Sequence, residues 1–318
     1  MLPENDFTRA CRRSLLAAVL LVCMGLTPLW SVDAAKAEQT FVVYTTFYPT
    51  TYFAQRIGGE HVKVVCPCPA EADPASWMPE EKTIEAYQQA DLIVVNGASF
   101  EKWLAKVTLP KSRIVDTTRP LADRFITLER GITHSHGKAG KHTHRGIDGH
   151  TWVDPANARI QAAEILKALV KKLPDHKAAF EEGYAALAKD LDALHARLEA
   201  VSERIGDRQL LSNHPAYNYI ARHYGWRVKV FYLEPEEPTD QEELDGVRDF
   251  LKDHPAKYLL WEAEPSEEIA RQMRDEFGLE SVVFSPCEAL DAEQLKRGED
   301  FLTVMNRNVD HLEKVFGK

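Results

Sequence analysis

The chain has 318 residues, more than one compact core usually holds, and this length favours two lobes of ordinary domain size. Hydrophobic residues make up 44% and charged residues 28%, values that exclude a disordered or membrane-embedded chain. The formal charge of −10 excludes nucleic acid as a partner, because nucleic acid attracts a positive surface, and it is compatible with a cation as ligand.

The N-terminal segment has the features of an export signal. Three arginines precede an apolar stretch at 15–26 that is short for a membrane span, and Ala35 and Ala37 supply an Ala-x-Ala cleavage site. We therefore expect residues 1–37 to be a signal peptide, with cleavage after Ala34 as the alternative. A periplasmic or extracytoplasmic protein follows from this expectation.

Three cysteines remain after removal of that signal, Cys66, Cys68 and Cys287. An odd number leaves at least one thiol unpaired within a monomer. The sequence leaves open whether Cys287 forms a bridge to Cys66 or Cys68, because geometry decides it.

The first half of the remaining chain alternates between short β-branched runs and helical patterns. Strands are expected at 40–46, 61–65, 92–95 and 113–115, and helices at 52–57, 80–89 and 100–107. Alternation at this spacing is typical of βαβ units and a mainly parallel sheet.

Two helices are expected in the middle of the chain. Residues 130–149 are rich in Gly, His, Lys and Ser and predict a mobile loop. A helix at 155–172 follows, starting with Pro155. A second, capped by Asp175, carries apolar residues every three or four positions up to about Ile205, long enough to cross between two lobes.

The α/β alternation then resumes. Strands are expected at 209–212, 228–232, 258–261 and 281–284, and helices at 216–224, 241–252, 266–277 and 301–315. The predicted fold is two Rossmann-like α/β lobes joined by a long rigid backbone helix, with the ligand cleft between them. The corresponding bounds are 38–172 for the N-terminal lobe with a His-rich loop at 131–149, 173–206 for the linking helix and 207–318 for the C-terminal lobe.

Histidines cluster in one segment of the chain. Five of the twelve lie within seventeen residues, at His134, His136, His142, His144 and His150. Imidazole is a strong ligand for zinc, copper and nickel, so this loop predicts metal capture.

Two histidines occupy positions suited to a fixed site. His150 precedes an ordered turn that leads into a helix, and His214 directly follows a predicted strand and precedes Pro215. Strand ends are where a cleft ligand is expected in an open α/β sheet. Either residue alone would be assigned to capping or to the core, but together they predict a metal site.

Three segments resemble a known family: Asp148-Gly-His-Thr-Trp-Val-Asp-Pro155, Leu211-Ser-Asn-His-Pro-Ala-Tyr-Asn-Tyr219 and Gln89-Ala-Asp-Leu-Ile-Val-Val-Asn-Gly97. They are similar to segments of the cluster 9 metal-binding proteins of ABC transporters, the zinc and manganese import group. The resemblance covers essentially the whole chain after the signal. It implies two α/β lobes, a backbone-spanning helix, little hinge motion and one cation held between the lobes by four side chains, of which His150 and His214 match two.

The other two family ligands have no match here. Ala75 stands where the family usually has a histidine, and Ser285 stands where an aspartate before proline is common. Zinc usually takes four ligands, so other side chains must complete the shell. The candidates are Glu262, our first choice, then Glu288, with the remaining possibilities being Glu264, Cys287, Cys68 or a histidine of the loop.

The sequence therefore predicts the solute-binding component of a metal ABC importer that captures a divalent cation and delivers it to a membrane permease. The histidine richness favours zinc over manganese, and the sequence alone leaves this choice open. There are two alternatives. One is the same fold with a changed cargo, a metal chelate or a small organic ligand, bound in a cleft lined by aromatic residues. The other is a metal-binding adhesin. An enzyme is not expected, because no hydrolase, phosphate-binding or dinucleotide-binding motif is present. Metal affinity should fall as pH drops through the normal histidine range, near about 6.5.

Overall fold

The computed structural model describes residues 40–135, 141–237 and 239–317, with the backbone alone for residues 129–135 and 141–145. The expected signal peptide and His136 lie outside the described residues. Among the helices that are described, none is long and apolar enough to cross a membrane.

The N-terminal lobe is built on a four-stranded parallel sheet of order β2-β1-β3-β4. Its strands are β1 (Phe41–Thr45), β2 (Val62–Val65), β3 (Leu92–Val95) and β4 (Ile114–Asp116). Every residue of β3 is buried, as expected for a central strand of a parallel sheet with both faces covered. Helices α2 (Tyr48–Gly58) and α3 (Glu81–Gln89) connect the strands.

The C-terminal lobe repeats this plan with a parallel sheet of order β10-β9-β7-β8. Its strands are β7 (Gln209–Ser212), β8 (Arg227–Val230), β9 (Tyr258–Trp261) and β10 (Glu280–Val283). Its helices are α6 (Asn218–Tyr224), α7 (Gln241–Asp253), α8 (Glu267–Phe277), α9 (Ala292–Lys296) and α10 (Phe301–Phe316). The two-lobe α/β prediction is thus confirmed, with most element bounds within one or two residues of those expected.

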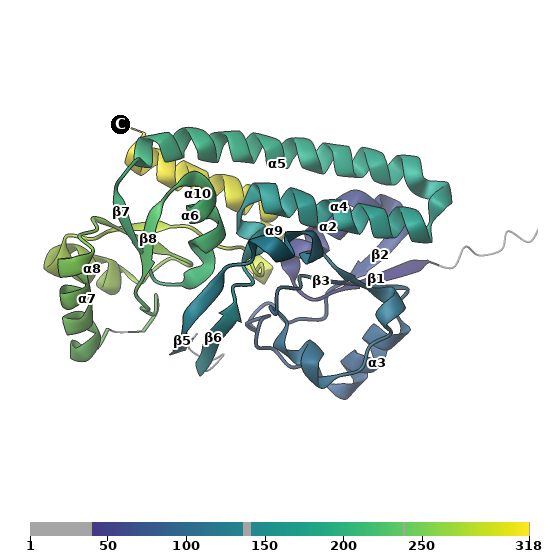
Figure 1. The fold of residues 1–318 in the computed structure, drawn as a ribbon, viewed down its shortest axis with the longest axis horizontal. Coiled ribbons are helices and arrows are strands. Elements are labelled where there is room, and N and C mark those ends of the chain that lie inside the picture. Colours follow the sequence, from purple (N-terminus) through teal and green to yellow (C-terminus); the bar gives the residue numbers. More distant parts are fainter. Residues whose placement is uncertain (1–39, 136–140, 238, 318) are drawn as a thin grey trace, which may run out of the picture. The chain divides into compact units, whose positions relative to one another are not determined.

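Helices α4 (Pro155–Lys172) and α5 (Lys177–Ile205) follow the first sheet and precede the second along the chain. The two helices pack side by side (Figure 1). Asp154 caps α4 by accepting a hydrogen bond from the Ala156 amide. The 29-residue α5 contacts α4 and α2 of the N-terminal lobe and α6 and α10 of the C-terminal lobe. Its buried leucines face a single hydrophobic core that includes strand residues of both sheets.

Four expectations need correction. Helix α2 begins at Tyr48, four residues earlier than predicted, and the predicted helix at 100–107 is a short 3-10 helix, Lys102–Lys106. Asp175 does not cap α5, because it lies within a 3-10 turn, Pro174–His176, and the helix starts after His176 with no side-chain cap.

The fourth correction concerns the predicted loop at 130–149. Much of it forms an antiparallel hairpin of β5 (Thr127–Ser135) and β6 (Lys141–Ile147), with a register shift between Leu128 and Ile132. The strands of this hairpin are held by backbone hydrogen bonds. Their residues are mostly polar, so the sequence lacks the alternation of apolar and polar residues from which a strand is predicted. His134 lies opposite His142 in the ladder, and Ile132 opposite His144.

The structure also decides the question of a disulfide bridge, which the sequence left open. Cys66, Cys68 and Cys287 are all free thiols, so no bridge connects them. Cys287 is buried, and burial raises the pKa of its thiol well above the usual range.

Candidate metal centre

His150 and His214 come from different lobes and lie side by side. His150 follows the hairpin and starts a 3-10 turn, Thr151–Val153, whereas His214 starts a second 3-10 turn, Pro215–Tyr217, just after β7. Each retains only 3% of its exposure, and their Nε2 atoms are 3.4 Å apart. Two buried imidazoles with nitrogens this close can hold one ion between them.

Glu288 adds a third donor to this pair. Its carboxylate oxygen lies 3.1 Å from His150 Nε2, and one ligand atom from each of the three residues lies within 4.8 Å of the others. The residue follows β10 through a turn in which Cys287 adopts φ 58°, a conformation that is uncommon for a side chain other than glycine. The Cys287 amide donates to Ser285 Oγ across this turn at 3.2 Å, just before Glu288.

Asp148 fixes the orientation of His150. One of its oxygens, Oδ1, lies 2.7 Å from His150 Nδ1, which leaves Nε2 directed at His214. Its other oxygen accepts from the Asn218 side chain at 2.9 Å, and its carbonyl accepts from Tyr219 Oη at 2.8 Å, both on the opposite lobe. A carboxylate behind an imidazole holds the ring and its tautomer, as in many metal sites. Asp148 and Asn218 have no recognisable role in the sequence alone, although both lie in the segments that carry the family resemblance.

Glu262, our first choice for the third ligand, lies on the other side of His214. Its Oε2 is 3.3 Å from His214 Nδ1, and its backbone amide donates to Asn213 Oδ1. Among the described residues, the group of close metal donors contains Glu288 and not Glu262. Glu262 therefore has the position of a carboxylate that orients His214, as Asp148 orients His150.

The remaining candidates lie outside the donor group. Glu264 is exposed, Cys287 is buried beside Glu288, and Cys68 is half-buried in the loop after β2. Burial, with the nearby Cys66, raises the pKa of Cys68 to about 12. The side chains of His134, His142 and His144 belong to the stretch whose backbone alone is described.

Charge in the metal-free site favours a proton on His150. Burial by itself lowers the pKa of His150, but its hydrogen bonds to Asp148 and Glu288 outweigh burial and raise the pKa to about 10. Burial, together with the charges of Glu288 and Glu234, raises the pKa of Glu262 to about 8. Both groups must lose a proton before the site presents its full negative charge to a cation.

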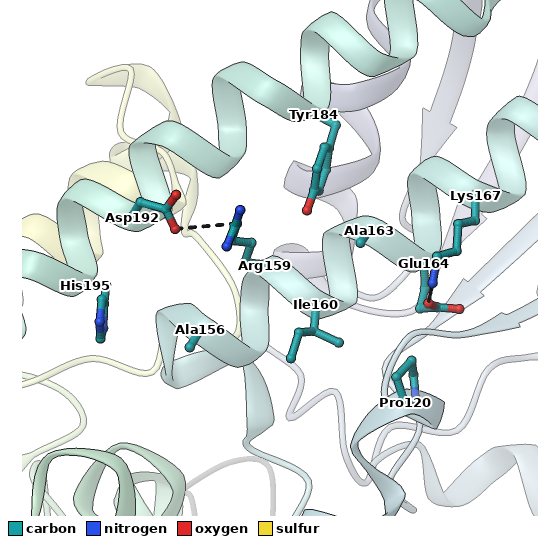
Figure 2. Close-up of a pocket in the computed structure, with 10 residues that line it drawn as sticks. All are labelled: Pro120, Ala156, Arg159, Ile160, Ala163, Glu164, Lys167, Tyr184, Asp192 and His195. Carbon is teal, nitrogen blue, oxygen red and sulfur yellow. Dashed lines mark hydrogen bonds and ion pairs between the residues drawn. The ribbon is translucent and has the colours of Figure 1, made fainter.

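A cavity of about 320 Å³ opens beside the donor group. Glu262 and Glu288 line it from one lobe, and the loop 70–74 lines it from the other. A larger cavity of about 550 Å³ lies elsewhere, along α4 and α5 (Figure 2). There Arg159 points to Asp192, with 3.5 Å between Nε and Oδ1, and Lys167 pairs with Glu164, so its charges are already matched within the chain.

Comparison with known proteins agrees with this architecture. The chain is 28% identical over 314 residues to the high-affinity zinc uptake system protein ZnuA of Bacillus subtilis, covering 93% of this chain and 94% of that protein. It is 27% identical over 305 residues to the zinc-binding lipoprotein AdcA of Streptococcus pneumoniae, and the alignment spans 60% of that longer relative. The crystal structure of the Zn(II)-bound ZnuA-like domain of Streptococcus pneumoniae AdcA superimposes with a TM-score of 0.75 at 25% identity, covering 88% of this chain and all of that domain.

The family model described as ZnuA, zinc-uptake complex component A, periplasmic, matches residues 43–315. This match includes both sheets apart from the first two residues of β1, together with α5 and all three residues of the donor group. The chain therefore belongs to the ZnuA family of periplasmic zinc-uptake components.

Proposed function

We propose that this protein is the extracytoplasmic solute-binding component of a zinc ABC importer, exported through a signal peptide of residues 1–37. It captures Zn²⁺ between its lobes and delivers it to a permease in the membrane. The observation that carries the proposal is the convergence of His150, His214 and Glu288, from both lobes, within 4.8 Å of one another. The zinc uptake and zinc-binding relatives support the same cargo.

The donor types favour zinc over manganese. Two imidazole nitrogens and one carboxylate suit a borderline cation such as Zn²⁺, whereas Mn²⁺ prefers sites dominated by oxygen. Both rings keep only 3% of their exposure, which limits competition from bulk water at their nitrogens. The role is capture and delivery rather than catalysis, and the histidines at 134–144, whose side chains lie outside the described part of the chain, raise the local zinc concentration.

Metal titration calorimetry on residues 38–318 tests the proposal. We expect one tight zinc site, much weaker binding of Mn²⁺, and loss of the zinc site in a His150→Ala/His214→Ala variant. A matched control is His61→Ala/His176→Ala, which also removes two neighbouring imidazoles, with ring centroids 4.1 Å apart, outside the donor group. Zinc binding that survives in the first variant would place the cargo site elsewhere.

A further inference from the structure

The donor group falls one short of the number that zinc usually takes. Zinc in proteins is almost always four-coordinate when its site is closed by side chains, and three protein ligands are typical of sites that leave one position for an outside molecule. Within the described part of the chain, the close donors are His150, His214 and Glu288. One coordination position is therefore not supplied by this group.

Two other carboxylates that line the same cavity as Glu288 already have partners. Glu262 faces His214 Nδ1 and also accepts from the Asn213 side chain at 3.4 Å. Asp73 closes its own turn, because Oδ1 accepts from the Ala75 amide at 2.8 Å and Oδ2 accepts from Ser76 Oγ at 2.6 Å. Moving either carboxylate to the metal would break these bonds.

The cavity of about 320 Å³ reaches the donor group, because Glu288 belongs to both. At about 30 Å³ per water molecule, it has room for a small molecule and several waters. Among the described residues that line it, the ionisable ones are Glu71, Asp73, Glu262 and Glu288. All four are acidic, so the cavity repels anions and accepts neutral or positive molecules.

We propose that the fourth ligand of the bound zinc is an exchangeable neutral donor from solution, water or an imidazole-type nitrogen, which enters through this cavity. The acidic lining disfavours carboxylate donors. The inference rests on the proposed function, since it describes how the same zinc site is completed.

Cobalt(II) is the probe, because its visible spectrum reports the number and type of ligands. Residues 38–318 are loaded with less than one equivalent of Co²⁺, and imidazole or acetate is added. We expect imidazole to shift the absorption bands in a saturable way, and acetate to bind at least about tenfold more weakly because of the acidic lining. In a Glu71→Gln variant, which removes one exposed charge of the lining, acetate binding should strengthen and imidazole binding should not change.

Two results would overturn the inference. A spectrum that imidazole leaves unchanged would mean that the fourth position does not exchange with donors from solution, for example because both oxygens of Glu288 fill it. Equal binding of acetate and imidazole would refute selection by charge. The same measurements on a variant lacking residues 133–145 show whether the cobalt spectrum comes from the cleft and not from the hairpin histidines. Calorimetry with zinc then separates the two possible failures. A tight zinc site without an exchangeable ligand would refute this inference alone, whereas the absence of a tight zinc site would refute the proposed function as well.

Discussion

Zinc binding should expel a proton from His150 even in mildly alkaline solution. The carboxylates of Asp148 and Glu288 raise the pKa of this imidazole to about 10 in the metal-free protein, and zinc requires its Nε2 lone pair. A group with a raised pKa keeps its proton until the pH approaches the raised value. The competition between zinc and the proton should therefore extend well above the ordinary histidine range.

The magnitude follows from the two pKa values. At pH 8.5 an ordinary histidine with pKa about 6.5 is only about 1% protonated, whereas one with pKa about 10 is about 97% protonated. At pH 7 zinc must displace a proton that His150 holds with a pKa about three units higher. The zinc affinity at pH 7 is therefore about a thousandfold lower than for fully deprotonated His150, which corresponds to about 4 kcal/mol. Affinity should thus keep rising about tenfold per pH unit above pH 7, instead of levelling near pH 6.5 as the sequence alone predicts.

The assay is displacement calorimetry at pH 8.5 in two buffers of different ionisation enthalpy, which gives the number of protons released per zinc. Most Glu262 side chains have already lost their proton at this pH, so His150 dominates the release from the protein. We expect at least about one proton per zinc, measured with imidazole present so that zinc-bound water does not add to the count. Asp148→Asn removes the carboxylate behind the ring and should reduce the release, whereas His61→Ala should not. A release close to zero in the unmodified protein would refute the reasoning.

Three further outcomes are expected. Glu288→Gln should weaken zinc binding by at least about 100-fold in calorimetry, and Glu264→Gln, at an exposed position outside the donor group, should not weaken it. Deleting residues 133–145 should leave one tight zinc site and slow metal loading in stopped-flow experiments; loss of all binding would place the site in the hairpin. Leu194→Ala, in the buried face of α5, should lower the free energy of unfolding by about 2–5 kcal/mol, whereas Leu295→Ala, at 55% exposure, should change it by less than about 0.5 kcal/mol, as measured by urea denaturation.

The sequence predicted the regular elements well because their signals are local. The all-buried strand Leu92–Val95 and helix α4, with its Asp154-Pro155 start, have the bounds expected from β-branched runs and capping residues. His150 and His214 were identified because each lies next to a recognisable turn at the end of an element. The hairpin was missed because backbone hydrogen bonds between polar residues leave no periodic pattern.

The choice between Glu262 and Glu288 could not be made from the sequence. Both follow neighbouring parallel strands of one sheet, β9 and β10, by one and five residues, so both were reasonable candidates. What separates them is the left-handed turn at Cys287, and a cysteine gives no sign that it adopts positive φ. The role of Asp148 depends on a contact with Asn218, 70 residues away in the chain, which only the folded structure brings about.

The long helix α5 and the core beneath it have a consequence for how the molecule responds as a whole. Val43 and Val94 of one sheet share a single buried cluster with Leu210 and Leu260 of the other. The halves of the chain should accordingly melt in one cooperative step, and a split at Gly206 would expose apolar surface on both fragments. Zinc held at 100 times its dissociation constant would add about 2.7 kcal/mol to that one step, so amide hydrogens far from the ion should also exchange more slowly with solvent.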